Sequence, residues 1–336
     1  MRTSLTQILL GTALLAGALV VSTWVGVIHV APLDALGALR DGLTGRAGHS
    51  MTETLVLDVR LARGVAAAGV GASLAVAGCM LQSLLRDPLA SPTMIGTAQA
   101  SGFGRVLGAY LGLSYGGSVA LSYVSALGAA LVVLAIARSR RGFPSQVVLL
   151  SGVNVGMLFA ALVGLVQYSS RDEGQLSRMV LFLLGGLWQA TWDQVAWIAP
   201  LMALAILATG LLARELDLFA LGEEHARRLG LGTQRVGVIV LLLASLLTSL
   251  AVSIAGVVAF VGLIVPHAAR RLTGPMHARL VPLSALLGAL LVLLVDGIAR
   301  TAVAPSELPL GVLTSLIGVP VFLLLLRSMV RSGGAR

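Results

Sequence analysis

The chain has 336 residues, of which 57% are hydrophobic and 11% are charged, whereas a typical soluble domain carries about 25% charged residues. This composition excludes a soluble globular protein and predicts one membrane domain over residues 1–336. The formal net charge of +9 comes from 23 arginines without a lysine, and in a membrane protein such an excess indicates basic cytoplasmic loops rather than nucleic-acid binding.

Ten apolar segments follow one another along the chain, and most approach the roughly 20 residues with which a helix crosses a bilayer. We therefore predict an all-α membrane protein with about ten transmembrane helices. The first segment is longer than the core of a signal peptide and is expected to remain as an uncleaved span. The segments are 6–31, 61–84, 94–113, 117–137, 146–169, 195–213, 236–256, 258–272, 281–299 and 308–327.

Some stretches depart from a simple span. The eighth segment is short, and 179–189 is apolar but too short to cross, which predicts a half-helix that enters from one side. Glycines and prolines in 255–262 and 309–320 predict bends or interruptions of helices. Membrane proteins tolerate such breaks only inside the protein or beside a water-filled cavity.

The distribution of arginines predicts the orientation of the chain. With a cytoplasmic N-terminus, fifteen arginines fall in inner segments and seven in outer segments, while Arg105 lies within the third span. Because cytoplasmic loops are the more basic ones, both termini are expected in the cytoplasm.

A short internal repeat indicates two related halves. The sequence LAVAG at 74–78 closes the second span, and AVSIAG at 251–256 closes the seventh. An odd number of spans separates the two, so the halves are expected to be inverted, as in many transporters.

Arginines mark the predicted outer ends of two spans. Arg60 and Arg63 open the second span, and Arg300 closes the ninth. Asp296 precedes Arg300 at the i,i+4 spacing of an acid–base pair on one helix face. These arginines either anchor span ends at the membrane interface or receive an acidic partner from outside.

The predicted inner turn between the second and third spans contains Asp87, Pro88 and Leu89, with Pro92 shortly after. Two prolines stop helix continuation and fix a rigid turn. The segment is either a tight connection or a gate at the inner mouth of a pathway.

Arg105 stands in the middle of an apolar span, where an arginine costs roughly 2.5–3.5 kcal/mol on insertion scales. Such a residue faces the interior of the bundle or a water-filled path. A structural pairing and a contact with the substrate both remain open.

The longest predicted cytoplasmic loop, 214–235, contains a short amphipathic helix with acids at its start and arginines at its end, as the helix dipole favours. It is either a solvated connector or a docking helix for a cytoplasmic partner. The residues expected to make this contact are Leu221, Gly222, Glu223, Glu224, Ala226, Arg227, Leu229 and Gly230.

Several kinds of site are not expected in this chain. A phosphate-binding loop of the GxxxxGK[ST] type cannot exist without lysine, so the chain is not a conventional ATPase. One cysteine excludes an internal disulfide, and the sequence lacks a catalytic constellation. Metal-ligand spacing on a common helix is not found among His29, His49, His225, His267 and His277.

Taken together, several long motifs resemble those of the FecCD family of permeases, and the resemblance covers nearly the whole chain. The family serves type II ABC importers of iron–siderophore complexes, haem and vitamin B12. The motifs are RLAR at 60–63, GCMLQSLLRDPLASP at 78–92, LGEEHARRLGL at 221–231, GLIVPH at 262–267, DGIAR at 296–300 and the segment 307–320, which begins ELPLG.

The resemblance implies a type II importer fold in a bacterial cytoplasmic (inner) membrane and a permease dimer, most simply a homodimer. It implies two cytoplasmic ATPase subunits that use ATP and Mg²⁺, a periplasmic or lipid-anchored binding protein, and no cofactor in this chain. The family's coupling helices match 219–231, and its outer docking arginines match Arg60, Arg63 and Arg300. Its inner gates resemble 87–89 and the turn 143–145, which contains Pro144 and Ser145.

The sequence departs from the family pattern at Ala62, where the family often has proline, at Asp87, where it often has asparagine, and at Arg105. The expected substrate is an iron–siderophore complex, with haem or cobalamin as alternatives. An ion-coupled secondary transporter is the rival function, but Asp296 is the only acid well inside a predicted span. A membrane-embedded enzyme is a third alternative.

Overall fold

The computed structural model describes the whole chain except residues 1, 46–47, 49, 138–143, 171 and 334–336. The described chain is helical throughout its regular structure, as predicted. Its elements are α1 (Arg2–Trp24), α2 (Pro32–Leu43), α3 (Met51–Glu53), the π-helical turn η1 (Thr54–Leu61), α4 (Ala62–Leu85), α5 (Thr97–Tyr110), α6 (Tyr115–Ala137), α7 (Ser145–Tyr168), α8 (Glu173–Leu184), α9 (Trp192–Leu211), α10 (Ala213–Ala220), α11 (Glu223–Arg228), α12 (Thr233–Ala255), α13 (Val261–Thr273), α14 (His277–Thr301) and α15 (Leu310–Gly333).

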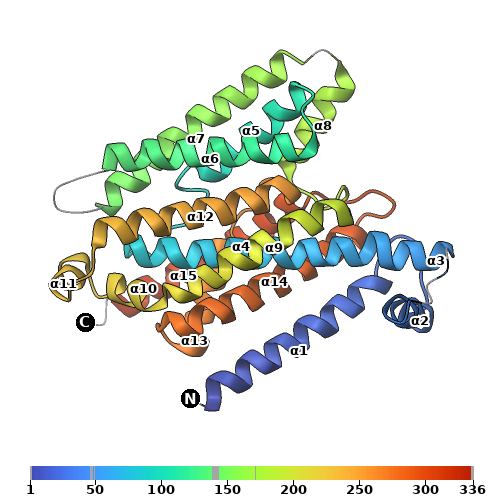
Figure 1. Cartoon of the computed structure of the whole chain (residues 1–336), viewed down its shortest axis with the longest axis horizontal. Coiled ribbons are helices and arrows are strands. Elements are labelled where there is room, and N and C mark those ends of the chain that lie inside the picture. Colours follow the sequence, from blue (N-terminus) through green and yellow to red (C-terminus); the bar gives the residue numbers. More distant parts are fainter. Residues whose placement is uncertain (1, 46–47, 49, 138–143, 171, 334–336) are drawn as a thin grey trace.

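Each of the ten predicted spans coincides with a helix, although the helices differ in length. Among the described residues, seven helices are long and apolar enough to cross a membrane. They are α1, the continuous helix Met51–Leu85 that contains α4, and α6, α7, α9, α12 and α14. The helices α5 and α13 have 14 and 13 residues, fewer than the roughly 20 that cross a bilayer. In Figure 1 many of the long helices run lengthwise, with α11 at one end and α2 and α3 at the other.

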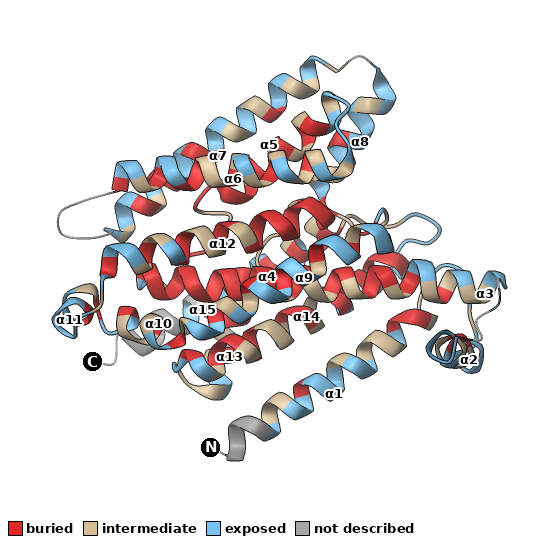
Figure 2. Cartoon of the chain, in the orientation of Figure 1, coloured by how far each residue is buried: buried red, intermediate tan, exposed pale blue. Residues whose placement is uncertain are grey.

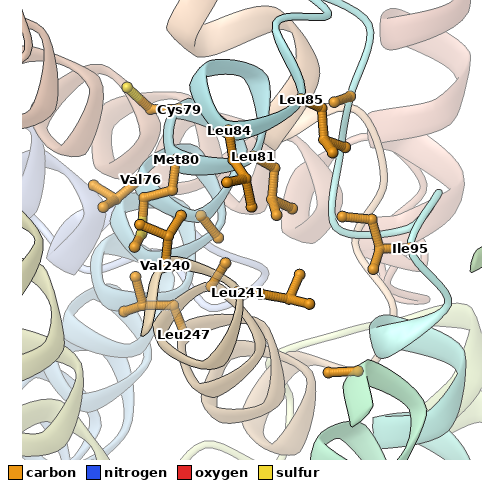
Figure 3. Close-up of a cluster of buried hydrophobic side chains, with 14 of the residues drawn as sticks. Val76, Cys79, Met80, Leu81, Leu84, Leu85, Ile95, Val240, Leu241 and Leu247 are labelled. Atoms are coloured by element: carbon orange, nitrogen blue, oxygen red, sulfur yellow. The ribbon is translucent and has the colours of Figure 1, made fainter. Parts of the chain in front are cut away.

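Helix α4 forms the centre of the bundle. It packs against α9, α12, α13 and α14 and is buried along almost its whole length (Figure 2). Figure 3 shows Val76, Met80 and Leu81 of α4 close to Val240 and Leu241 of α12. A helix that is apolar on all sides, such as α4, is expected to be buried in this way.

Glycines allow α4 to cross its neighbours closely. A Cβ atom on Gly71 would lie 2.0 Å from the carbonyl oxygen of Gly288 on α14, and one on Gly78 would lie 1.8 Å from that of Gly262 on α13. The backbones therefore touch at both crossings, which is how membrane helices gain packing without a hydrophobic driving force.

The break predicted in 255–262 is present between α12 and α13, where Gly256 and Phe260 both have positive φ (+66° and +65°). Part of its backbone is paired inside the protein, because the amide of Gly186 donates to the carbonyl of Ala255 at 2.8 Å. An interruption within 309–320 is not present, while a bend at Pro320 inside α15 stays a prediction. This segment begins the continuous helix α15, and the interruption precedes it at 302–309.

The half-helix predicted at 179–189 is present as α8, but it begins and ends earlier. Asp172 caps it by accepting a hydrogen bond from the amide of Gln175, and Gly185 follows its last residue. An Asp cap and a terminal glycine, rather than the apolar residues alone, set these bounds. The first copy of the short repeat, 74–78, lies within α4 rather than at its end.

Candidate functional site

A buried cluster of ion pairs joins α4 to α14 near α1 and α2. The Arg63 guanidinium lies 2.9 Å (Nη2) and 3.0 Å (Nε) from Oδ1 of Asp296, and Nη2 lies 2.8 Å from Oε2 of Glu307. Arg300 pairs with the other oxygen of Asp296 at 3.1 Å. Asp296 is fully buried. The predicted i,i+4 pair of Asp296 and Arg300 is confirmed, whereas the contact with Glu307 was not predicted.

Arg60 and Arg300 also hold the end of α1 and the segment that follows it. Arg60 donates from Nη1 to the carbonyl of Thr23 at 2.9 Å and from Nη2 to that of Ile28. Arg300 Nη1 donates to two carbonyls of the same segment at 3.3 and 3.2 Å. The exposed fractions of Arg60, Arg63 and Arg300 are 4%, 7% and 4%. Their guanidinium groups are thus engaged within the chain, and a role in docking stays a prediction.

The short helix predicted in the 214–235 loop is present as α11. Glu223 pairs with Arg227 at 3.1 Å and Glu224 with Arg228 at 2.7 Å, both at i,i+4. Acids occupy its first turn and basic residues its last turn, as the helix dipole favours. The predicted charge pattern is confirmed.

Apolar side chains flank α11. Leu221 and Leu229 are 67% and 66% exposed, while Ala226 between them is buried. Gly222 and Gly230 bound the helix with φ of +114° and +85°, a conformation that glycine adopts without strain. The helix thus presents two exposed leucines beside a charged surface, and its role as a coupling helix stays a proposal.

A buried relay links α10 to α4 through α14. Nδ1 of His277 lies 2.6 Å from Oδ1 of Asp217 on α10, and its Nε2 hydrogen-bonds Oγ of Ser83 on α4. The residue is 1% exposed. Sequence reasoning missed this contact because the partners of His277 are 60 and 194 positions away.

Gln82 makes a second connection at this end of α4. Its Nε2 donates to the carbonyls of Gly262 and Leu263 at 3.3 Å, and its Oε1 accepts from Nη1 of Arg270 at 3.2 Å. The amide therefore joins α4 to the start and to the last turns of α13. This contact was also missed, since nothing in the sequence around Gln82 distinguishes it from an ordinary helix residue.

The predicted gate turn directly follows α4. Arg86 ends the helix with a φ of +53°, and a Cβ atom on Gly222 beside α11 would lie 3.5 Å from its Nη1. Oδ1 of Asp87 accepts from the amide of Leu89 at 2.8 Å, which makes the turn rigid. Pro88 and Leu89 face residues of α13 and α15 across a small cavity. The structure therefore brings this turn together with the α11 segment.

The second predicted gate turn is described only in part. Phe143 lies outside the described residues, while Pro144 precedes α7 and Ser145 is its first residue. Two turns into α7, a Cβ atom on Gly152 would lie 2.5 Å from the carbonyl oxygen of Met94. Helix α7 therefore packs against the segment that leads from the first gate turn to α5, and the gating role of both turns stays a proposal.

Arg105 on α5 lies beside a cavity of about 160 Å³ between α5 and α8. Its guanidinium carbon lies 4.8 Å from the ring centre of Tyr115 and 5.7 Å from that of Phe182. Its Nε is buried without a hydrogen-bond partner among the described residues. Arg178 lines the same cavity. The prediction that Arg105 faces the interior or a path is compatible with this position, and its role stays a proposal.

A larger groove of about 650 Å³ lies on the other side of the end of α8. Its wall is almost entirely apolar and comes from α8, the break between α12 and α13, and α15. The lining residues include Leu183, Leu184, Val257, Val312, Leu316 and Val319.

Potential metal ligands are scattered. Within the part of the chain that the structure describes, no three side chains of His, Cys, Asp or Glu lie close enough together to hold a metal ion. Cys79 is buried in α4, and His277 is occupied by its two hydrogen bonds. The cavity beside Arg105 is lined by arginines, amides and apolar side chains.

Known proteins resemble this chain over nearly its whole length. The Fe(3+) dicitrate transport system permease protein FecD of Escherichia coli is 37% identical over 318 residues, which cover 95% of this chain and 97% of FecD. The hemin transport system permease protein HmuU of Yersinia pestis is 37% identical over 286 residues, which cover 83% of this chain and 85% of HmuU.

The fold is also similar to that of a solved transporter in an inward-facing conformation, assigned to the metal-chelate type of ABC transporter. The TM-score is 0.82 at 30% sequence identity, and the match covers 96% of this chain and 99% of that one. The FecCD transport family matches residues 14–328. The chain therefore belongs to the FecCD transport family.

Proposed function

We propose that this chain is the membrane permease subunit of an ATP-driven importer of metal chelates, which moves its substrate into the cytoplasm by alternating access. The observation that carries the proposal is the family match over 14–328. It is supported by the similarity in fold to a transporter of the metal-chelate type. The chain itself is a transport subunit and not an enzyme.

Two copies of the chain would form a central pathway, and the apolar groove along α8 and α15 is a suitable wall for it. Two cytoplasmic ATPase subunits would dock on α11 and its exposed leucines, and they would bind the ATP and Mg²⁺. From α11, motion would reach α4 through Asp217, His277 and Ser83, whose contacts link the three helices. The turns at 87–89 and 144–145 would gate the inner mouth.

The opposite end of the molecule, near α2, would receive a periplasmic or lipid-anchored binding protein. Arg60, Arg63 and Arg300 belong to this end and are proposed to contribute to the docking surface. This arrangement places both termini in the cytoplasm and the chain in a bacterial inner membrane, in agreement with the distribution of arginines.

An iron–siderophore complex is the proposed substrate, with haem or cobalamin as alternatives carried by the same machinery. FecD is described as a permease for Fe(3+) dicitrate and HmuU as one for hemin. A single family therefore serves different chelates, and family membership alone does not select one.

Reconstitution tests the proposal. The chain, its ATPase and its binding protein in proteoliposomes should accumulate an iron chelate only when ATP is supplied, and the chain alone should hydrolyse no ATP. An ion-coupled transporter would instead accumulate the chelate without ATP and stop when an ionophore collapses the ion gradient. That result, or ATP hydrolysis by the purified chain alone, would contradict the proposal.

A further inference from the structure

The cavity between α5 and α8 carries an unbalanced positive charge. Two arginines, Arg105 and Arg178, and two amides, Gln175 and Gln189, line it, and none of its lining residues is a carboxylate. Among the described residues, neither arginine has an ion-pair partner. The nearest acids along the chain, Asp172 and Glu173, lie before and at the start of α8, and Asp172 caps the helix. The cavity is thus electrostatically suited to an anion.

The Arg105 guanidinium lies beside two aromatic rings, and one of its donors has no hydrogen-bond partner among the described residues. Tyr115 and Phe182 lie beside it at cation–π distances. Its Nε is buried and has no hydrogen-bond partner in the part of the chain that the structure describes, which is unfavourable for a charged donor. A planar guanidinium in fixed orientation is suited to bind a carboxylate with two parallel hydrogen bonds.

The size and position of the cavity indicate what part of a ligand it takes. About 160 Å³ is small beside the roughly 300–1,000 Å³ of pockets that enclose whole ligands. Phe182 lines this cavity, while the next two residues, Leu183 and Leu184, line the apolar groove. A ligand in the groove could therefore place one charged arm past Phe182 and against Arg105.

We propose that Arg105 and Arg178 form an anion subsite that binds a carboxylate arm of the transported chelate, so that the permease selects carboxylate-bearing over neutral metal chelates. This inference rests on the proposed function and adds the chemical class of its substrate. A lipid phosphate could engage the same guanidinium groups, and the experiment separates these two sources.

Binding to the purified transporter tests the subsite directly. The permease with its ATPase partner is placed in nanodiscs of phosphatidylcholine, and binding of radiolabelled ferric citrate and of a neutral ferric trihydroxamate is measured by equilibrium dialysis. We expect wild type to bind ferric citrate, and R105Q and R178Q each to raise its dissociation constant about tenfold or more. The dissociation constant of the trihydroxamate should stay unchanged in both variants.

Arg40→Gln is the matched control. Arg40 is an exposed arginine on α2 that pairs only with its neighbour Asp41, so R40Q removes one positive charge without altering the cavity and should bind both chelates like wild type. Because Arg178 is exposed, the R178Q variant should fold. It therefore still tests the subsite if the R105Q variant fails to fold.

Three outcomes would overturn the subsite. They are no binding of ferric citrate by wild type, equal losses for both chelates, and R105Q and R178Q binding ferric citrate like wild type. A second set of nanodiscs that contain phosphatidylglycerol tests whether the site binds a lipid phosphate instead. If the variants change binding of that lipid but not of ferric citrate, the site belongs to a lipid headgroup. ATP-dependent uptake of the trihydroxamate by R178Q would show that the proposed function holds even if the subsite fails.

Discussion

Replacing Arg63 with alanine should strongly destabilise the protein. The change removes the charged hydrogen bonds to Asp296 at 2.9 and 3.0 Å and the contact with Glu307 at 2.8 Å. Asp296 is fully buried and keeps only Arg300 as a charged partner. Removing one member of a buried ion pair costs about 3–5 kcal/mol. Because Arg300 still neutralises part of the charge, we expect a loss of about 3 kcal/mol in the free energy of unfolding.

The matched control is Arg228→Ala in α11. Arg228 also forms a short ion pair, at 2.7 Å to Glu224, but the two side chains are 74% and 76% exposed. Such a pair contributes about 0–1 kcal/mol. Both variants are compared by denaturant unfolding of the purified chain in detergent micelles. A loss below about 1 kcal/mol for Arg63→Ala, or a loss equal to that of the control, would refute the assignment of Arg63 to the buried cluster.

Three further changes probe other parts of the molecule. Gly78→Ala should prevent folding because its Cβ would lie 1.8 Å from a backbone oxygen. Gly128→Ala is the control, since a Cβ there would have nothing within 4 Å and should leave the yield of folded protein unchanged. Size-exclusion chromatography compares the yields of the two variants. The double change Glu223→Arg and Glu224→Arg should weaken ATPase binding roughly tenfold by reversing charge at the start of α11, and unchanged affinity in a pull-down titration would count against α11 as the docking helix. His277→Ala should lower the free energy of unfolding by about 1 kcal/mol, since it removes the two side-chain hydrogen bonds to Asp217 and Ser83, and an unchanged free energy would mean that these contacts contribute little to stability.

Hydropathy predicted most of the fold because burial in a bilayer demands long apolar helices and little else. The same rule could not place α8 correctly, since a cap at Asp172 and a glycine at 185 set its ends. It also missed the amphipathic helices α2 and α10, which are too short and too polar to resemble spans. The sequence also could not predict where glycines let two helices cross closely, because only the folded chain shows which of its 40 glycines touch another backbone.

For the candidate site, local patterns were predictable and distant contacts were not. The charge pattern of α11 and the Asp296–Arg300 pair follow from i,i+4 spacing within one helix, and both are present. The relay through His277 depends on tertiary contacts between helices far apart in the chain, which no spacing encodes. The same holds for Arg63, whose position at a span end was predicted, while its burial among Asp296 and Glu307 depends on how α4 packs on α14.

The arrangement of polar contacts along α4 has a mechanical consequence. The helix has 24 residues and is thus a rod of roughly 36 Å, with Arg63 near one tip and Gln82 and Ser83 near the other. Between these tips, α4 packs through its side chains on α14 and α13 and touches their backbones at Gly71 and Gly78. A contact between two backbones leaves no room for an added Cβ atom, so it fixes how far apart the helix axes lie. Helix α4 therefore joins the contact with His277 at one end to the ion-pair cluster at the other as one continuous element, and the two glycine crossings fix its distance from α14 and α13.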